Sequence, residues 1–110
     1  MKKILVIAFA GTALLAASST FAAEAKENWD QHCAKCHGVD GAGKTKMGQK
    51  LKVKDYTDAK VQAEFTDEQL VKVTLEGSTK DGKELMRGFR EDLAPADATA
   101  LAAYIRQMKK

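Results

Sequence analysis

The sequence QHCAKCHG at residues 31–38 constrains the fold of this chain more than any other feature. It contains both cysteines of the 110 residues, Cys33 and Cys36, and His37 follows the second cysteine directly. Paired cysteines occur in disulfides, in metal sites, in redox-active dithiols and at points of haem attachment. The rest of the sequence discriminates among these possibilities.

The first three of these interpretations lack a part that they need. A disulfide across one helical turn would close a very short loop and would stabilise the chain little. A redox dithiol of the thioredoxin type needs strands that alternate with helices, and the sequence predicts none. Zinc needs a tetrahedral ligand set, and the two cysteines with their neighbours His32 and His37 lie too close along the chain to wrap around it. An iron–sulfur cluster would need about four cysteines.

The spacing C-x-x-C-H is the attachment sequence of a c-type haem. One helical turn places the thiols of Cys33 and Cys36 under the two vinyl groups, with which they form thioethers. His37 then lies beneath the iron, where we expect it to be the proximal ligand. One covalently attached haem c would also supply apolar bulk to a domain too small for a large core of its own.

The amino terminus has the pattern of a secretory signal peptide. Two lysines precede an uncharged run over residues 4–17, and small residues follow it. The run is shorter than the roughly 20 residues that span a bilayer, so we expect a cleaved signal over 1–22. Cleavage after Ala25 fits equally well. We therefore predict export to the periplasm and one domain over 23–110, which does not span a membrane.

Three segments carry helix signals, and no alternation of β-branched residues predicts a sheet. The first covers about 25–36, the second about 67–76, and the third runs from Pro95 nearly to the end. The connections 38–64 and 78–94 are long for a compact domain unless they wrap around something. The sequence thus predicts an all-α fold with three main helices and long loops around one haem.

Charge and motifs give no sign of nucleic acid or nucleotide binding. Two of the 18 basic residues lie in the signal segment, which leaves 16 against 15 acidic residues in the remaining chain. No basic stripe alternates with aromatic residues, as a nucleic-acid site would require. The stretch GVDGAGKT at 38–45 matches a phosphate-binding loop, but that motif works only after a buried strand, which is missing here.

From about residue 25 to residue 108 the sequence resembles class I cytochrome c, the small monohaem electron carriers. Trp29, four residues before the first haem cysteine, matches an aromatic on the first helix of that family. Leu101 and Tyr104 match the leucine and the aromatic on the last helix. The resemblance implies that these two helices cross in a cytochrome c fold.

The same family has a loop that reads glycine, proline, any residue, leucine. Gly48 and Leu51 match it, while Gln49 stands in place of the proline. In the family a backbone carbonyl of this loop accepts the ring proton of the proximal histidine. The resemblance therefore implies such a hydrogen bond to His37.

The resemblance also implies a distal iron ligand. Met86, in the stretch ELMRGF, resembles the distal methionine of the family, which is followed two or three residues later by an aromatic, here Phe89. Arg87 stands where many relatives have proline. Met47 falls in the loop expected on the proximal side, and Met108 falls on the apolar face of the last helix. We expect Met86 to be the ligand.

A haem with histidine and methionine ligands implies single-electron transfer between redox partner proteins, by a monomer without catalytic residues. Two alternatives remain: a haem enzyme or gas sensor with an open or labile sixth site, and an electron-accepting subunit of a periplasmic dehydrogenase. Five lysines between residues 44 and 54 form either an ordinary solvated loop or a docking surface for an acidic partner. They are Lys44, Lys46, Lys50, Lys52 and Lys54.

Overall fold

The computed structural model describes residues 13–110, and their side chains from Phe21 onward. Residues 1–12 of the predicted signal peptide lie outside the described residues, so its cleavage stays a prediction. Among the described helices, none combines the length and the apolar character needed to cross a bilayer.

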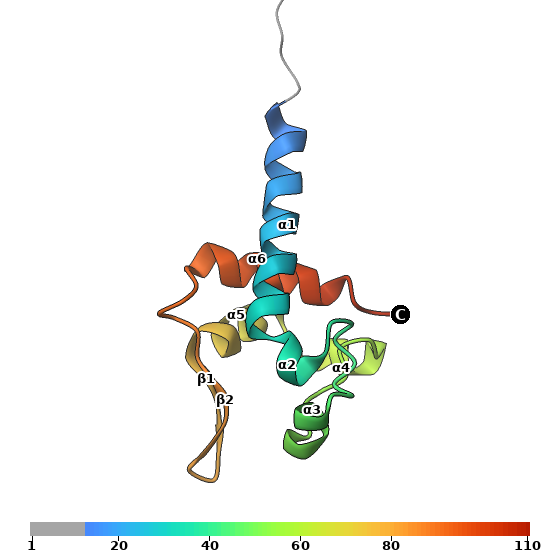
Figure 1. The fold of residues 1–110 in the computed structure, drawn as a ribbon, viewed down its shortest axis with the longest axis vertical. Coiled ribbons are helices and arrows are strands. Elements are labelled where there is room, and N and C mark those ends of the chain that lie inside the picture. Colours follow the sequence, from blue (N-terminus) through green and yellow to red (C-terminus); the bar gives the residue numbers. More distant parts are fainter. Residues whose placement is uncertain (1–12) are drawn as a thin grey trace, which may run out of the picture.

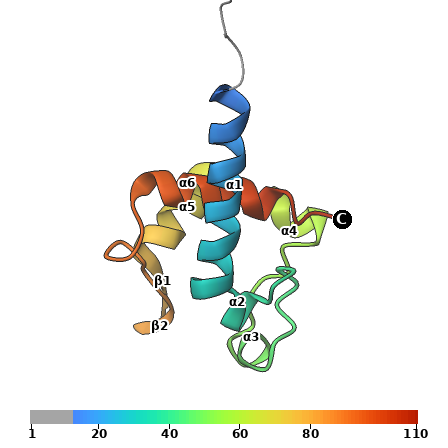
Figure 2. The same ribbon diagram turned by 45° about the horizontal axis from the view of Figure 1, so that its top comes forward.

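The chain is mostly helical, with one small two-stranded sheet. In Figure 1, the first long helix crosses the last one, and the sheet and a short helix extend on either side below the crossing. The view in Figure 2 shows the same crossing. In chain order the elements are α1 (Ala13–His32), α2 (Ala34–His37), α3 (Lys46–Leu51), α4 (Ala59–Ala63), α5 (Asp67–Glu76), β1 (Gly77–Lys80), β2 (Lys83–Arg87) and α6 (Pro95–Arg106).

Helix α5 has the bounds that its end signals predict. The Thr66 hydroxyl accepts from the Gln69 backbone N–H at 3.1 Å, and the Gln69 side-chain oxygen accepts from the Thr66 N–H at 2.9 Å. This reciprocal pair satisfies two N–H groups that the first turn leaves free. At the other end Gly77 has a φ of 79°, which few other residues adopt. Local chemistry therefore fixes both ends of the middle helix.

The predicted helix over 25–36 is divided in two at Cys33. Helix α1 ends at His32, and the backbone turns at Cys33 before α2 begins. The Cys33 carbonyl accepts from both Cys36 and His37, at 3.2 and 3.0 Å, so the turn tightens locally. Gly38, with a φ of 83°, then ends α2. The haem motif thus occupies a separate short turn below α1.

The all-α prediction is correct for the body of the fold, but the segment 78–94 is not a plain loop. Its first part forms a hairpin, in which β1 and β2 pair antiparallel with an irregularity between Ser78 and Thr79. Asp81 and Gly82 form the turn with φ values of 53° and 76°, as the Asp-Gly pair favours in two-residue hairpins. The strands lack β-branched alternation because most of their side chains are exposed, which is why the pattern predicted no sheet.

The predicted crossing of the first and last helices is confirmed at Trp29. Its ring centroid lies 6.0 Å from that of Tyr104, and it belongs to one buried cluster with Leu101. Trp29 and Leu101 are each only 1% exposed. The indole N–H also donates to the Gly38 carbonyl at 2.9 Å. Trp29 therefore ties the helix crossing to the turn that follows His37.

Replacing Trp29 by alanine is expected to lower the free energy of unfolding by about 3–5 kcal/mol, because the change leaves a large cavity and removes the indole hydrogen bond to the Gly38 carbonyl. Thermal melting of the haem-loaded protein measures this effect. The matched control is Val39→Ala, which removes an exposed apolar side chain and should change stability by less than about 0.5 kcal/mol. Equal melting temperatures for the two variants would contradict the crossing.

Candidate functional site

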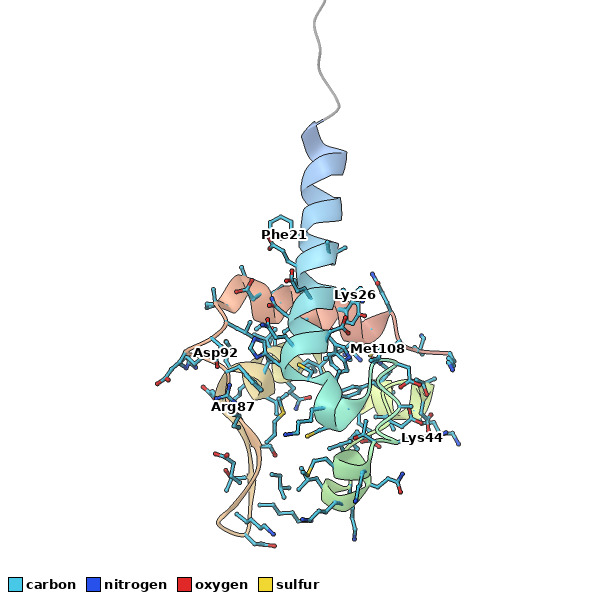
Figure 3. The ribbon with its side chains drawn as sticks, in the orientation of Figure 1. Phe21, Lys26, Lys44, Arg87, Asp92 and Met108 are labelled. Carbon is cyan, nitrogen blue, oxygen red and sulfur yellow. The ribbon has the colours of Figure 1, made fainter. Side chains whose placement is uncertain are left out.

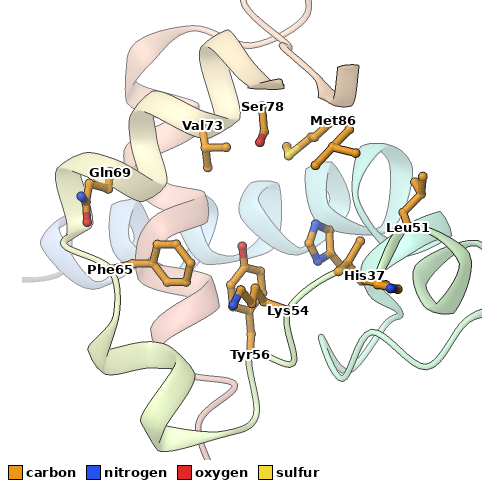
Figure 4. A pocket seen from close by; sticks show the side chains of 12 residues that line it. His37, Leu51, Lys54, Tyr56, Phe65, Gln69, Val73, Ser78 and Met86 are labelled. Carbon is orange, nitrogen blue, oxygen red and sulfur yellow. The ribbon is translucent and has the colours of Figure 1, made fainter. Parts of the chain in front are cut away.

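Two adjoining cavities lie between the short helix α2, the strand β2 and the segment that follows α3. Their volumes are about 420 and 380 Å³, within the usual range of small-molecule sites. Figure 4 shows the first cavity, into which the side chains of His37 and Met86 both point. Both cavities share the lining residues His37, Leu51, Val53, Leu85 and Met86. The walls are mainly apolar, although several charged and polar side chains also line them.

Cys33 and Cys36 form part of the wall of the second cavity. Neither cysteine is in a disulfide, although they lie only three positions apart. Burial raises the pKa of the Cys33 thiol to about 12, and the neighbouring Cys36 adds to the shift. Reactive dithiols instead have lowered pKa values. Burial therefore keeps the Cys33 thiol neutral at the edge of an apolar cavity, which argues against a dithiol redox site.

His37 presents a neutral imidazole to the same space. Burial lowers the pKa of its ring below the usual value, so the ring stays uncharged at neutral pH. A neutral imidazole has one nitrogen lone pair available to a metal. The other nitrogen, Nδ1, is buried and has no hydrogen-bond partner among the described residues. His37 therefore has the protonation state that a metal ligand requires.

The hydrogen bond expected from the loop around Gly48 to His37 does not form. The segment is a short helix, α3, and its backbone carbonyls accept hydrogen bonds at its own carboxyl end. The Gly48 carbonyl accepts from the Val53 N–H at 3.0 Å, and the Gln49 carbonyl accepts from the Lys52 N–H at 3.3 Å. Gly48 itself packs so closely against the Cys36 carbonyl that a Cβ would collide with it. The loop thus holds the haem motif through backbone packing, while the carbonyls point elsewhere.

The three candidate methionines lie in different surroundings. Met86 is on β2, opposite Ser78, and lines both cavities. Met47 is 37% exposed on α3 and lines neither of them. Met108 packs its sulfur against Gly41, and Figure 3 shows it near the carboxyl end of α6. Of the three, Met86 shares the cavities with His37.

Two glycines, Gly77 and Gly88, allow the backbone at the ends of the hairpin to pack closely beside Met86. A side chain at Gly77 would collide with the Met86 carbonyl, and one at Gly88 would collide with the Leu75 carbonyl. The backbone of β2 therefore crosses directly over the end of α5. This close crossing fixes where β2 enters the cavity wall, although Arg87, and not a proline, follows Met86.

His32, the residue before the first haem cysteine, packs its ring against an aromatic neighbour. Its ring lies 5.3 Å from that of Phe89, and the Arg87 guanidinium lies 4.3 Å above the same phenyl ring. Arg87 also pairs with Asp92 at 2.7 Å (Figure 3). The three side chains close one side of the second cavity. No local sequence pattern predicts this contact, because it joins residues more than fifty positions apart.

These residues fit a haem better than a bare metal ion. Within residues 21–110, no three histidine, cysteine or acidic side chains gather in a way that would hold a metal ion. One neutral imidazole and one thioether suit iron that a porphyrin already holds. Two free thiols at the edge of the cavity suit covalent attachment, and the apolar walls suit the macrocycle.

Comparisons with known proteins agree with this fit. Residues 20–105 match the family model described as "Cytochrome C oxidase, cbb3-type, subunit III". The solved structure of "KustC0563 c-type cytochrome" is 36% identical, with a TM-score of 0.70 over 78% of this chain and 98% of that one. A tyrosine-to-phenylalanine mutant of Kustc0563 is 35% identical, with a TM-score of 0.68 over 78% and 99%. Among curated proteins no significant match was found.

The family model covers most of the chain, and both solved structures are covered almost completely. The fold, the cavities and the comparisons therefore lead to one family. The chain belongs to the c-type cytochromes, as a small monohaem class I member that carries covalently attached haem c and serves haem electron transfer.

Proposed function

We propose that the chain shuttles single electrons in the periplasm through a haem attached at Cys33 and Cys36 and ligated by His37 and Met86. The observation that carries this proposal is the pair of cavities that His37 and Met86 line together, from α2 on one side and β2 on the other. The haem, when bound, supplies an iron that alternates between the ferric and ferrous states. The chain supplies both axial ligands and an apolar enclosure.

The surroundings of Met86 support a closed site over an open one. The glycine crossing at Gly77 and Gly88 fixes the backbone beside Met86, and the ion pair of Arg87 with Asp92 holds the next residue. A thioether held in this way would occupy the sixth position and leave no place for a substrate or gas molecule. This arrangement favours an electron carrier over a haem enzyme or gas sensor.

The cellular context of the proposal rests on the sequence. The signal pattern over residues 1–22 predicts export, and the mature domain over 23–110 then acts as a monomer between redox partner proteins. A dehydrogenase subunit would use the same chemistry with a permanent partner. Gel filtration of the exported protein distinguishes a monomer from a chain that needs a partner for stability.

An absorption spectrum of the exported protein tests the core of the proposal. The oxidised form should show the weak far-red band of a sulfur-ligated ferric haem, and the reduced form should bind carbon monoxide slowly or not at all. A spectrum without this band, together with rapid carbon monoxide binding, would favour the open-site alternative. A protein without haem would contradict the proposal altogether.

The lysine cluster, defined as the five lysines between residues 44 and 54, is the proposed docking surface for an acidic partner. All five side chains are exposed, and Lys52 and Lys54 line the first cavity beside His37. Within residues 21–110, Lys54 is the only one of the five with an ion-pair partner, Glu64 at 3.4 Å. The cluster thus places uncompensated positive charge at the mouth of the proposed haem site.

The variant Lys50→Glu/Lys52→Glu should slow electron transfer to ferricyanide roughly tenfold at low salt, because steering by charge acts on the association rate. Stopped-flow kinetics measures the effect, which salt should largely remove. The control is Lys26→Glu/Lys72→Glu, which makes the same change in net charge on α1 and α5, away from the cavity, and should have a smaller effect. Rates that are independent of ionic strength would leave the cluster as an ordinary solvated loop.

A further inference from the structure

The ring of Tyr56 stacks on the ring of His37. The two ring centroids are 5.2 Å apart, and the ring planes differ by only 18°. Trp29 lies near the imidazole as well, at 5.6 Å and a steeper angle of 43°. Among the described residues, no acceptor takes the Nδ1 hydrogen that relatives bond to a loop carbonyl. Aromatic contacts, and not a hydrogen bond, therefore surround the imidazole.

Tyr56 is itself held firmly from both sides of its backbone. Its N–H donates to the Gly41 carbonyl at 2.9 Å, and its carbonyl accepts from the Gln62 side-chain amide at 2.7 Å. Gln62 is 5% exposed, and the same amide nitrogen donates to the Ile105 carbonyl at 2.8 Å. Arg106 donates to the Gln62 side-chain oxygen at 2.9 Å. A buried polar side chain with all its groups paired is a rigid anchor.

We propose that Tyr56 is the positioning residue that sets the plane of the His37 imidazole, in place of the carbonyl hydrogen bond, and that Gln62, on α4, anchors Tyr56 to α6. The inference rests on the proposed role of His37 as proximal ligand. A flat ring stacked within 18° leaves the imidazole one favourable orientation, whereas a branched aliphatic side chain would not.

A consequence for electron transfer follows from the free Nδ1. A hydrogen bond from this nitrogen to a carbonyl makes the imidazole a stronger electron donor to the metal. Without it, His37 donates less strongly, which favours the ferrous state and raises the reduction potential. Loss of the Tyr56 ring would admit water to Nδ1, so it should lower the potential.

Nuclear magnetic resonance of the haem-loaded protein tests the proposal in the unmodified chain. In the ferrous, diamagnetic form, nuclear Overhauser effects should connect the ring protons of His37 and Tyr56. In the ferric form, the spread of the haem methyl shifts reports the plane of the imidazole. Absence of the Overhauser effects in a protein whose His37 resonances are assigned would overturn the proposal without any mutation.

Two variants separate the stacked ring from the hydroxyl group. Tyr56→Phe keeps the ring and should leave the methyl shift pattern and the potential nearly unchanged. Tyr56→Leu removes the ring and should change the pattern and lower the potential, while the far-red methionine band persists. Tyr56→Phe is therefore the matched control for Tyr56→Leu, because it changes the same position and keeps the aromatic ring.

The possible failures are distinguishable. An unchanged methyl pattern in Tyr56→Leu would show that Tyr56 does not orient the imidazole, even though the haem and its ligands are in place. If the methyl shift pattern changed as much in Tyr56→Phe as in Tyr56→Leu, the effect would come from the hydroxyl group, which would contradict the stacking role. If the unmodified protein lacks covalent haem or the methionine band, the proposed function fails instead.

Discussion

Replacement of both Cys33 and Cys36 by alanine is expected to abolish covalent haem attachment completely. After acid-acetone extraction the wild-type protein should keep its colour, and the double variant should release all of its haem. Either single variant should keep one thioether and shift the pyridine haemochrome band. The expected effect is large because each thioether needs its own thiol, and the described chain has no other cysteine.

The double variant should also lose stability. The cavities beside α2 have apolar walls that a bound haem would cover, and burial of this apolar surface stabilises the folded state. A domain of this size has a small core of its own. Loss of attachment should therefore lower the melting temperature and the yield of folded protein together, as circular dichroism would show.

The exposed residue between the two cysteines provides the matched control. Lys35→Ala changes the same turn without removing a thiol, so it should keep both thioethers and an unchanged haemochrome band. Colourless wild-type protein from a host that exports and attaches haem would contradict the central interpretation. If the double variant retained haem after acid-acetone extraction, the assignment of Cys33 and Cys36 as the attachment residues would be wrong.

The parts of the fold that the sequence predicted are those set by short-range chemistry. The ends of α5 depend on Thr66, Gln69 and Gly77, which act on their own neighbours in the chain. Pro95 begins α6, and the Asp97 carboxylate accepts from the Ala94 N–H at 2.9 Å. Such signals operate before any tertiary contact forms, so a sequence reveals them.

The parts that were missed depend on contacts between distant residues. The hairpin of β1 and β2 buries little, so its residues lack the alternation that marks a half-buried strand; only the Asp81-Gly82 pair indicated it. The resemblance predicted a carbonyl acceptor for His37, but the sequence does not show that α3 uses its carbonyls internally. The Tyr56 stack on His37 joins residues nineteen positions apart and had no local signal.

The distal ligand is the second site where a single change should have a large effect. Met86→Ala is expected to abolish the far-red band of the oxidised protein and to open the iron to carbon monoxide or water. The reduction potential should fall by a substantial fraction of the roughly 0.8 V range that axial ligands set in haem proteins, because a thioether favours the ferrous state. Visible spectroscopy and potentiometric titration measure these effects.

Two other methionines provide controls of the same chemical type. Met47→Ala removes a partly exposed thioether on α3, and Met108→Ala removes one that packs on Gly41. Neither methionine lines the two cavities, so both variants should keep the far-red band, the slow binding of carbon monoxide and the reduction potential. If Met47→Ala erased the band while Met86→Ala preserved it, the assignment of the ligand would be wrong.

The outcome at Met86 also decides between carrier and catalyst, because the two functions differ in whether the sixth position is held by the chain. Two kinds of contact hold β2 in place: the close backbone crossings at Gly77 and Gly88, and the ion pair of Arg87 with Asp92. An exposed ion pair contributes at most about 1 kcal/mol, so the glycine crossings should dominate. Gly88→Ala should therefore weaken the methionine band more than Arg87→Ala does. A reversed order would mean that Met86 is held mainly by its neighbour's charge and would make a labile sixth site the better interpretation.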